Sequence, residues 1–96
     1  MAWRWRHEPH AVVGEYAPAW QVRGEFFEDE EGEPLVRVKI LQGGRERYRC
    51  VIPQFPETSF DALYERLAAI ADRFRDPVGH LMRSRGLVKP FRMRKT

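Results

Sequence analysis

Five basic side chains at alternating positions of three short segments could bind phosphate groups or an acidic protein. They are Arg23, Arg37, Lys39, Arg47 and Arg49. Alternate residues of a β-strand point to the same face of a sheet, so these side chains share one face if the three segments are neighbouring strands. Arginine suits phosphates and guanine edges because its planar guanidinium donates several hydrogen bonds in a fixed geometry. The spacing therefore predicts a basic binding surface.

The three segments, 20–28, 35–41 and 45–52, alternate in polarity with the period of two that is typical of half-buried strands. In an antiparallel meander, their even-numbered apolar residues stay on one face only if each connecting loop has an odd number of residues. We therefore expect a five-residue loop over 29–33. We expect a three-residue loop over 42–44, with Gly44 in the left-handed conformation that glycine tolerates.

With these registers, the odd-numbered residues form a grid of three rows on the outer face. The rows are Arg23, Lys39 and Arg47; then Glu25, Arg37 and Arg49; then Phe27, Leu35 and Val51. Five basic side chains share the grid with a single glutamate, whereas a surface that serves only solubility intersperses the two signs. The grid is therefore a binding face or, alternatively, a solvated face of an arginine-rich protein.

Apolar residues recur at spacings of three and four from Phe60 to Phe74, which predicts an amphipathic helix that covers the even-numbered face of the sheet. Thr58 followed by Asp61 fits a capping box, and Ser59 is an alternative cap. Asp76-Pro77 and Gly86 predict a short second helix, from about residue 77 to residue 85. The expected fold is α+β: a three-stranded antiparallel meander packed on one long helix, followed by a short helix and a basic tail.

The expected domain organisation is one β-β-β-α-α domain over 20–86, because 96 residues suffice for a single core. Residues 1–19 are expected to be an arm of undetermined structure, since Pro9 and Pro18 interrupt it. Its alternating Trp3, Arg4, Trp5 and Arg6 leave open a fourth strand. The two indoles could instead fold over the apolar row of the grid.

Charge is unevenly spread along the chain. The formal net charge is +3, with −2 on residues 1–58 and +5 on residues 59–96. The last fourteen residues contain no acidic side chain and six basic ones: Arg83, Arg85, Lys89, Arg92, Arg94 and Lys95. A polycationic segment of this kind is typical of phosphate-backbone binding, although it also serves as a solubilising end.

The residues that could support catalysis or metal binding are isolated in the sequence. Ser59 and Ser84 lie in no nucleophile motif, and Cys50 falls on the inward face of its strand. His7 and His10 lack a second pair of zinc-type ligands, and the acidic segment 28–33 lacks the pattern of a calcium loop. We expect no enzyme activity, no cofactor and no bound metal.

Nucleic-acid binding is the first functional hypothesis, with DNA favoured over RNA and the basic tail as a second contact. The alternative is a protein-binding regulator or subunit, in which Phe27, Leu35 and Val51, with Trp3 and Trp5, form an apolar patch inside an arginine rim against an acidic partner. The position of the two indoles distinguishes the two: a covered apolar row favours nucleic acid and a bare one favours protein. We expect a cytoplasmic protein without membrane contact, because the sequence has no secretory signal and no apolar segment long enough to span a bilayer.

Overall fold

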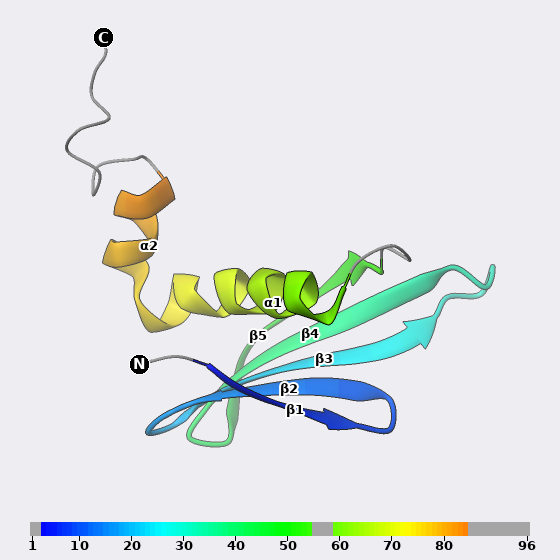
Figure 1. Ribbon diagram of the computed structural model, residues 1–96, viewed down its shortest axis with the longest axis horizontal. Helices are drawn as coiled ribbons and strands as arrows, with labels where there is room; N and C mark the ends of the chain where they lie inside the picture. The colour runs from blue at the N-terminus through cyan, green and yellow to red at the C-terminus, as the bar shows by residue number, and fades with distance from the viewer. Residues whose placement is uncertain (1–2, 55–58, 85–96) are drawn as a thin grey trace, which may run out of the picture.

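A computed structural model describes residues 3–54 and 59–84 of the chain, and the predicted tail over 87–96 lies outside these residues. In chain order, the elements are the strands β1 (Arg4–Glu8), β2 (Ala11–Tyr16), β3 (Trp20–Glu28), β4 (Pro34–Gln42) and β5 (Arg45–Pro53) and the helices α1 (Phe60–Arg75) and α2 (Pro77–Ser84). The strands form one antiparallel meander in the order β1-β2-β3-β4-β5. The α+β class is therefore confirmed (Figure 1).

The sheet has five strands, so the expectation of three, with a fourth as an alternative, is corrected. The two additional strands, β1 and β2, occupy the segment 1–19 to which the sequence assigned no structure. All of the first four residues of β2 are buried, so β2 lacks the alternation of polarity by which a half-buried strand is recognised. Pro9 and Pro18 lie in the loops that bound β2 rather than in its ladder.

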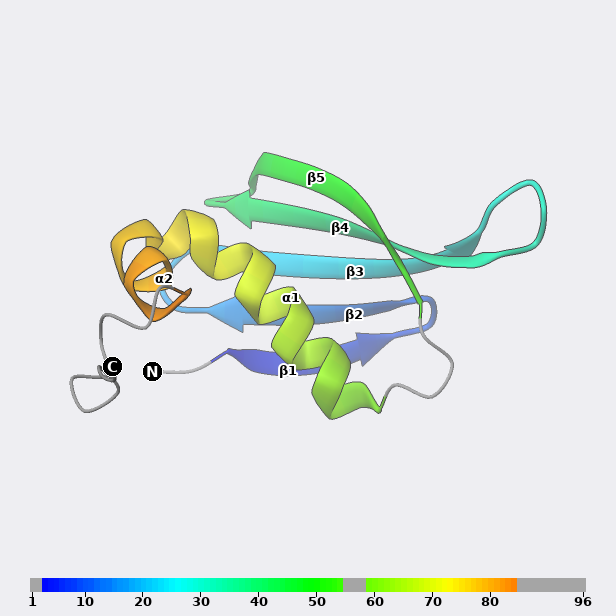
Figure 2. The same ribbon diagram turned by 90° about the horizontal axis from the view of Figure 1, so that it is seen from above.

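The helix α1 crosses one face of the sheet diagonally (Figure 2). It buries Leu63, Leu67 and Ala71 against the sheet. The sheet contributes five fully buried side chains to the same core: Val12, Val22, Val36, Val38 and Ile40. The cap of α1 is Ser59, whose hydroxyl accepts a hydrogen bond from the backbone N–H of Ala62 at 3.2 Å. This places the cap one residue after Thr58, which lies outside the described residues.

The β4–β5 connection differs from the expected three-residue loop. Gln42 pairs with Arg45, so the turn consists of Gly43 and Gly44 alone, with φ of 59° and 83°. Two left-handed residues in a two-residue hairpin are typical of a type I′ turn. The parity that a two-residue turn would break is restored by a β-bulge, because Leu41 pairs with Glu46 and Ile40 already pairs with Tyr48.

Strand β1 is held under α1 by aromatic contacts. The indole of Trp5 stacks on the ring of Tyr64 with 4.6 Å between centroids, and the Nε1–H of Trp3 donates to Asp72 Oδ1 at 3.3 Å. Gly14, opposite Trp5 in the ladder, leaves room for the indole, since a Cβ there would lie 2.4 Å from Trp5 Cζ3. These contacts place both indoles on the helix-covered face of the sheet.

The second helix α2 follows α1 directly, with Asp76 Oδ1 accepting from the N–H of Gly79 at 3.1 Å. Its large apolar side chains, Val78, Leu81 and Met82, remain exposed. No helix in residues 3–54 and 59–84 is long and apolar enough to cross a membrane.

Candidate functional site

The outer face of the sheet, opposite α1, is left uncovered by both described helices (Figure 1). The predicted β3–β4 register is confirmed, since Arg23 pairs with Lys39, Glu25 with Arg37 and Phe27 with Leu35. The five-residue loop over 29–33 is confirmed as well, because β3 ends at Glu28 and β4 begins at Pro34. The β3 and β4 residues of the predicted outer face are therefore confirmed, whereas the residues that β1, β2 and β5 contribute differ from the prediction.

A basic row crosses all five strands in the middle of the outer face. Its residues, in strand order, are Arg6, Val13, Arg23, Lys39 and Arg49. The row on one side contains Arg4, Glu15, Gln21, Leu41 and Glu46, and the row on the other contains Glu8, Ala11, Glu25, Arg37 and Val51. Each neighbouring row thus places two glutamates beside the cations.

Every cation of the basic row forms an ion pair with a glutamate of a neighbouring row. Arg23 reaches Glu8 at 2.9 Å and Glu25 at 3.4 Å. Lys39 lies 3.3 Å from Glu25, and Arg49 lies 2.9 Å from Glu46. Arg6 completes the network by pairing with Glu15 and Glu8. Because the cations already have partners, a phosphate would have to compete with these carboxylates.

The same pairs lower the pKa of four glutamates. Hydrogen bonding and charge from Arg23 lower the pKa of Glu8, those from Arg6 lower the pKa of Glu15, and those from Arg49 lower the pKa of Glu46. For Glu25, desolvation raises the pKa, but the hydrogen bonds and charges of Lys39 and Arg23 outweigh it, so its pKa also falls. All four carboxylates are therefore held in the charged form.

The fifth cation of the predicted grid, Arg47, does not belong to the outer face. The bulge directs its guanidinium over the ring of Trp20, 5.8 Å from the centroid, and Arg47 also hydrogen-bonds Gln42. As a result, Lys39 pairs with Arg49 rather than Arg47, and Arg37 pairs with Val51 rather than Arg49. The prediction for these β4–β5 neighbours is wrong by two residues.

The three rows of the outer face carry a smaller charge than the predicted grid. The outward glutamates of β1, β2 and β5 could not be assigned while β1 and β2 were unassigned and the bulge unrecognised. The face holds six basic side chains, Arg4, Arg6, Arg23, Arg37, Lys39 and Arg49, and four acidic ones, Glu8, Glu15, Glu25 and Glu46. Its net charge is therefore +2, whereas the predicted grid carries +4.

An apolar corner closes the outer face at one end. We define it by Phe27, Leu35, Val51 and Pro53. Phe27 pairs with Leu35, Leu35 pairs with Pro53, and Val51 is 50% exposed. The guanidinium carbon of Arg37 lies 4.3 Å from the centroid of the Phe27 ring, so a cation borders the apolar surface.

Trp3 and Trp5 do not cover the apolar corner, because they lie on the opposite face of the sheet against Tyr64 and Asp72. The two indoles therefore do not form one patch with Phe27, Leu35 and Val51, as the protein-binding hypothesis assumed. No side chain of the described residues other than that of Arg37 is placed over the Phe27 ring by a ring or cation contact. The indoles thus leave the corner uncovered, with Phe27 and Leu35 half-buried and Val51 and Pro53 exposed.

A shallow groove of about 470 Å³, which the sequence does not predict, lies at the other end of the outer face. The side chains of one row, Arg4, Glu15, Gln21 and Leu41, line it together with the β2–β3 loop and the Gly43-Gly44 turn. The groove forms only when four strands and two turns meet, so no local pattern could indicate it.

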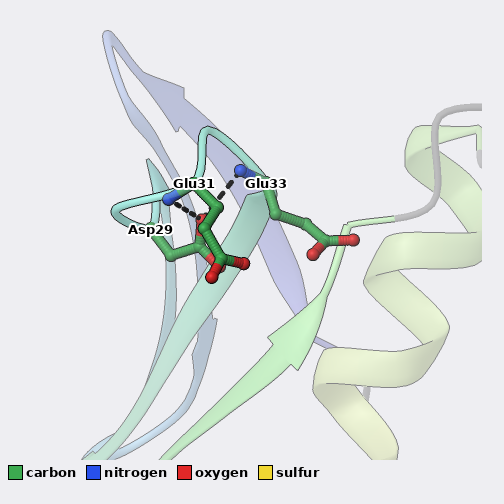
Figure 3. A group of neighbouring side chains, drawn as sticks. All are labelled: Asp29, Glu31 and Glu33. Atoms are coloured by element: carbon green, nitrogen blue, oxygen red, sulfur yellow. Dashed lines mark hydrogen bonds between the residues drawn. The ribbon is translucent and has the colours of Figure 1, made fainter.

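The acidic hairpin loop of Asp29, Glu31 and Glu33 gathers carboxylate oxygens within 4.8 Å of one another (Figure 3). Asp29 Oδ1 accepts the backbone N–H groups of Glu31 and Glu33 at 2.9 and 2.8 Å. The carboxylate of Asp29 thus organises the turn, and exposed Glu31 and Glu33 extend beside it. Turn formation accounts for this cluster without a metal ion.

Of the six basic residues predicted as a second contact, one lies within the described residues. Arg83 lies in the last turn of α2, and the other five basic tail residues lie outside the described residues.

Comparison of the chain with protein-family models, with curated proteins and with solved structures finds no match. The function is therefore inferred from the geometry of the outer face.

Proposed function

We propose that the protein is a small protein-binding regulator or subunit that contacts its partner through the apolar corner of the outer face. The observation that supports this proposal is an apolar corner with exposed Val51 and Pro53 and half-buried Phe27 and Leu35, next to cations that are ion-paired with glutamates. Protein interfaces combine an apolar centre with a polar rim and enrich aromatic residues and arginine. Phe27 under the Arg37 guanidinium provides that combination.

The energetics favour the corner as the centre of contact. Fully burying a side chain of the size of Val or Phe contributes about 1.5–3 kcal/mol, and a few central residues dominate most interfaces. The exposed ion pairs around the corner contribute about 0–1 kcal/mol each, so they act as a rim that sets orientation. Binding is therefore expected to depend on Phe27 and Val51 more than on the paired cations.

The test compares corner and control variants for binding to a partner captured from the native host and then purified. Phe27→Ala is expected to weaken binding by about tenfold or more, as for a central aromatic residue. Val78→Ala, which truncates a 68% exposed valine on α2, serves as the matched control and should leave affinity unchanged. Equal affinities of Phe27→Ala and the wild type in calorimetric titration would contradict the proposal.

Nucleic-acid binding is the second candidate, favoured by the net charge of +2 on the outer face and by the six basic residues of the last fourteen. If phosphates are the target, the double variant Arg37→Glu with Arg49→Glu should weaken binding to duplex DNA by more than about tenfold and flatten its salt dependence, because fewer counterions are released. Absence of wild-type affinity for duplex or single-stranded nucleic acid at low salt would exclude this candidate.

A further inference from the structure

The two ends of the molecule carry opposite charge. The segment 28–33, which holds five acidic residues and no basic one, turns at one end of the long axis, and α2 lies at the other end (Figure 2). The chain continues from α2 into residues 85–96, which hold five basic residues and no acidic one. The described part of the molecule is 48 Å long, so the two charged segments start far apart.

The acidic hairpin loop adjoins the apolar corner. Phe27 immediately precedes the segment 28–33, and Leu35 follows it after Pro34, with Phe27 and Leu35 paired across the hairpin. The loop is ordered by hydrogen bonds from Gly32 N to Asp29 O and from Asp29 N to Glu33 O, at 3.0 and 3.1 Å. This end of the outer face thus presents an apolar surface beside an acidic one, which is complementary to a segment that combines apolar and basic side chains.

Residues 85–96 have that composition. They contain the apolar residues Leu87, Val88, Met93 and Phe91 among the basic residues Arg85, Lys89, Arg92, Arg94 and Lys95. An aromatic anchor flanked by cations would place Phe91 on the apolar corner and its basic neighbours against the carboxylates of the loop.

The length of the chain decides which molecule supplies this segment. Phe91 is the seventh residue after Ser84, and seven residues of fully extended chain span at most about 25 Å. This is about half of the 48 Å long axis, at whose opposite ends α2 and the acidic loop lie. Because the apolar corner adjoins the acidic loop, Phe91 of a second copy is better placed to fill the corner than Phe91 of the same chain.

We infer that residues 85–96 of one copy bind the apolar corner and the acidic hairpin loop of a second copy. This inference rests on the proposed function, because it names the partner of the same corner. Such a contact closes a two-fold dimer if the two copies exchange their tails reciprocally, and it forms a ring or an open chain if they do not. The association should weaken as salt rises, because exposed charges are screened beyond about 10 Å at 0.1 M ionic strength.

The experiment reverses charge at each end of the full-length chain. The loop variant carries Glu30→Lys, Glu31→Lys and Glu33→Lys, and keeps Asp29 because its carboxylate orders the turn. The tail variant carries Lys89→Glu, Arg92→Glu and Arg94→Glu. Sedimentation velocity at low salt should show a mass that grows with concentration above that of the monomer for the wild type, and a monomer for each variant alone.

Two combinations of these charge reversals distinguish a lost contact from a variant that fails to fold. A mixture of the loop variant and the tail variant should associate, and a chain with both sets of reversals should self-associate again, because opposite charges then face each other. Phe27→Ala, with unchanged charge, should lower the association constant by about tenfold. A wild type that stays monomeric at every concentration at low salt, or variants that associate as the wild type does, would overturn the inference.

The outcomes also separate this inference from the proposed function. If the wild type is monomeric but Phe27→Ala loses a different purified protein partner, the self-association is refuted and the protein-binding function stands. If self-association occurs and responds to the charge reversals but not to Phe27→Ala, the apolar corner is not its site. Loss of association in all variants without recovery in the mixture would likewise refute the paired contact.

Discussion

At the scale of single residues, the absence of a side chain at Gly14 determines where the N-terminal strand packs. Gly14 is buried opposite Trp5, and the indole occupies the space that a side chain would fill. Trp5 in turn stacks on Tyr64 of α1, so one glycine lets the edge strand and the helix meet. Gly24 acts similarly in the core, where a Cβ would lie 3.1 Å from Leu67 Cδ1.

Gly14→Ala is expected to destabilise the protein by about 1–3 kcal/mol, because the new methyl group overlaps the Trp5 ring and forces it to move. The free energy of unfolding from urea denaturation, followed by tryptophan fluorescence, measures the loss. A Trp5→Leu background serves as the control: the smaller side chain should relieve part of the clash, so the cost of Gly14→Ala should be lower there. Equal costs in the two backgrounds would show that the indole is not the obstacle.

At the scale of elements, strand β5 keeps its apolar residues inward by means of one extra residue. The two-residue Gly43-Gly44 turn by itself would point the apolar side chains of β5 to the outer face. The extra residue of the bulge, Arg47, turns them back to the helix-covered face. The bulge and Pro53 also interrupt the outer edge of β5, which discourages further strand pairing there. The position of the bulge therefore decides which arginines reach the outer face.

Deleting Arg47 should preserve the fold, because Ile40 then pairs with Tyr48 after a regular two-residue hairpin and without the bulge. Deleting Arg49 should destabilise the protein strongly, since Cys50 and Ile52 would turn outward and Val51 inward. Thermal unfolding of both deletion variants measures the difference. A lower melting temperature for the Arg47 deletion than for the Arg49 deletion would contradict this assignment.

The helix α1 stabilises the protein through its buried stripe. Leu67 is fully buried, whereas Glu65, two residues earlier and on the other side of the helix, is exposed. Leu67→Ala is expected to lower the free energy of unfolding by about 2–5 kcal/mol through the cavity it leaves, and Glu65→Ala by less than about 0.5 kcal/mol. Similar losses in chemical denaturation would show that the buried face of α1 is misassigned.

At the scale of the whole molecule, the fold has two layers and leaves the outer face of its sheet to ion pairs. Arg23 on β3 reaches Glu8 on β1, and Val13 on the intervening strand β2 is fully buried although it points outward. Long arginine side chains cover apolar surface while their charged ends stay hydrated. The ion pairs thus complete the outer face of the sheet in place of a second helical layer.

The free energy of unfolding should decrease as the pH is lowered into the acidic range. The pKa values of Glu8, Glu15, Glu25 and Glu46 are lowered in the folded protein, so the unfolded chain, with glutamate pKa values of about 4.3, binds protons first. The stabilisation is therefore complete above the unfolded pKa and is lost as pH falls through the folded values. Urea midpoints measured from pH 7 down to about 3 at low salt check this.

The Glu25→Gln variant isolates the network, because Glu25 pairs with Arg23 and Lys39 at once. Its urea midpoint should vary less with pH than that of the wild type, and added salt should reduce the difference between them. An unchanged pH dependence in Glu25→Gln would show that its pairs do not contribute.

The sequence by itself determined the features that depend on local pattern. The alternation of polarity in 20–28, 35–41 and 45–52 predicts β3, β4 and β5 nearly to their ends, and the three-to-four spacing predicts α1 and its buried stripe. The β3–β4 rows follow as well, because a five-residue loop and parity fix that register. These elements are predictable because each one buries only one of its faces, which leaves a periodic pattern of apolar residues in its own sequence.

Only the tertiary structure decided the features that depend on contacts between distant segments. The first four residues of β2 are buried on both faces and therefore show no alternation, and β1 is recognised only from Trp5 against Tyr64 and Gly14. The bulge at Arg47 shifts the pairing of β5 by two residues relative to the prediction. A shift of two residues leaves each side chain on the same face of the sheet, so the parity of the loop length does not reveal it. The charge of the outer face followed from these same elements, because Glu8, Glu15 and Glu46 meet the predicted cations only when all five strands pair.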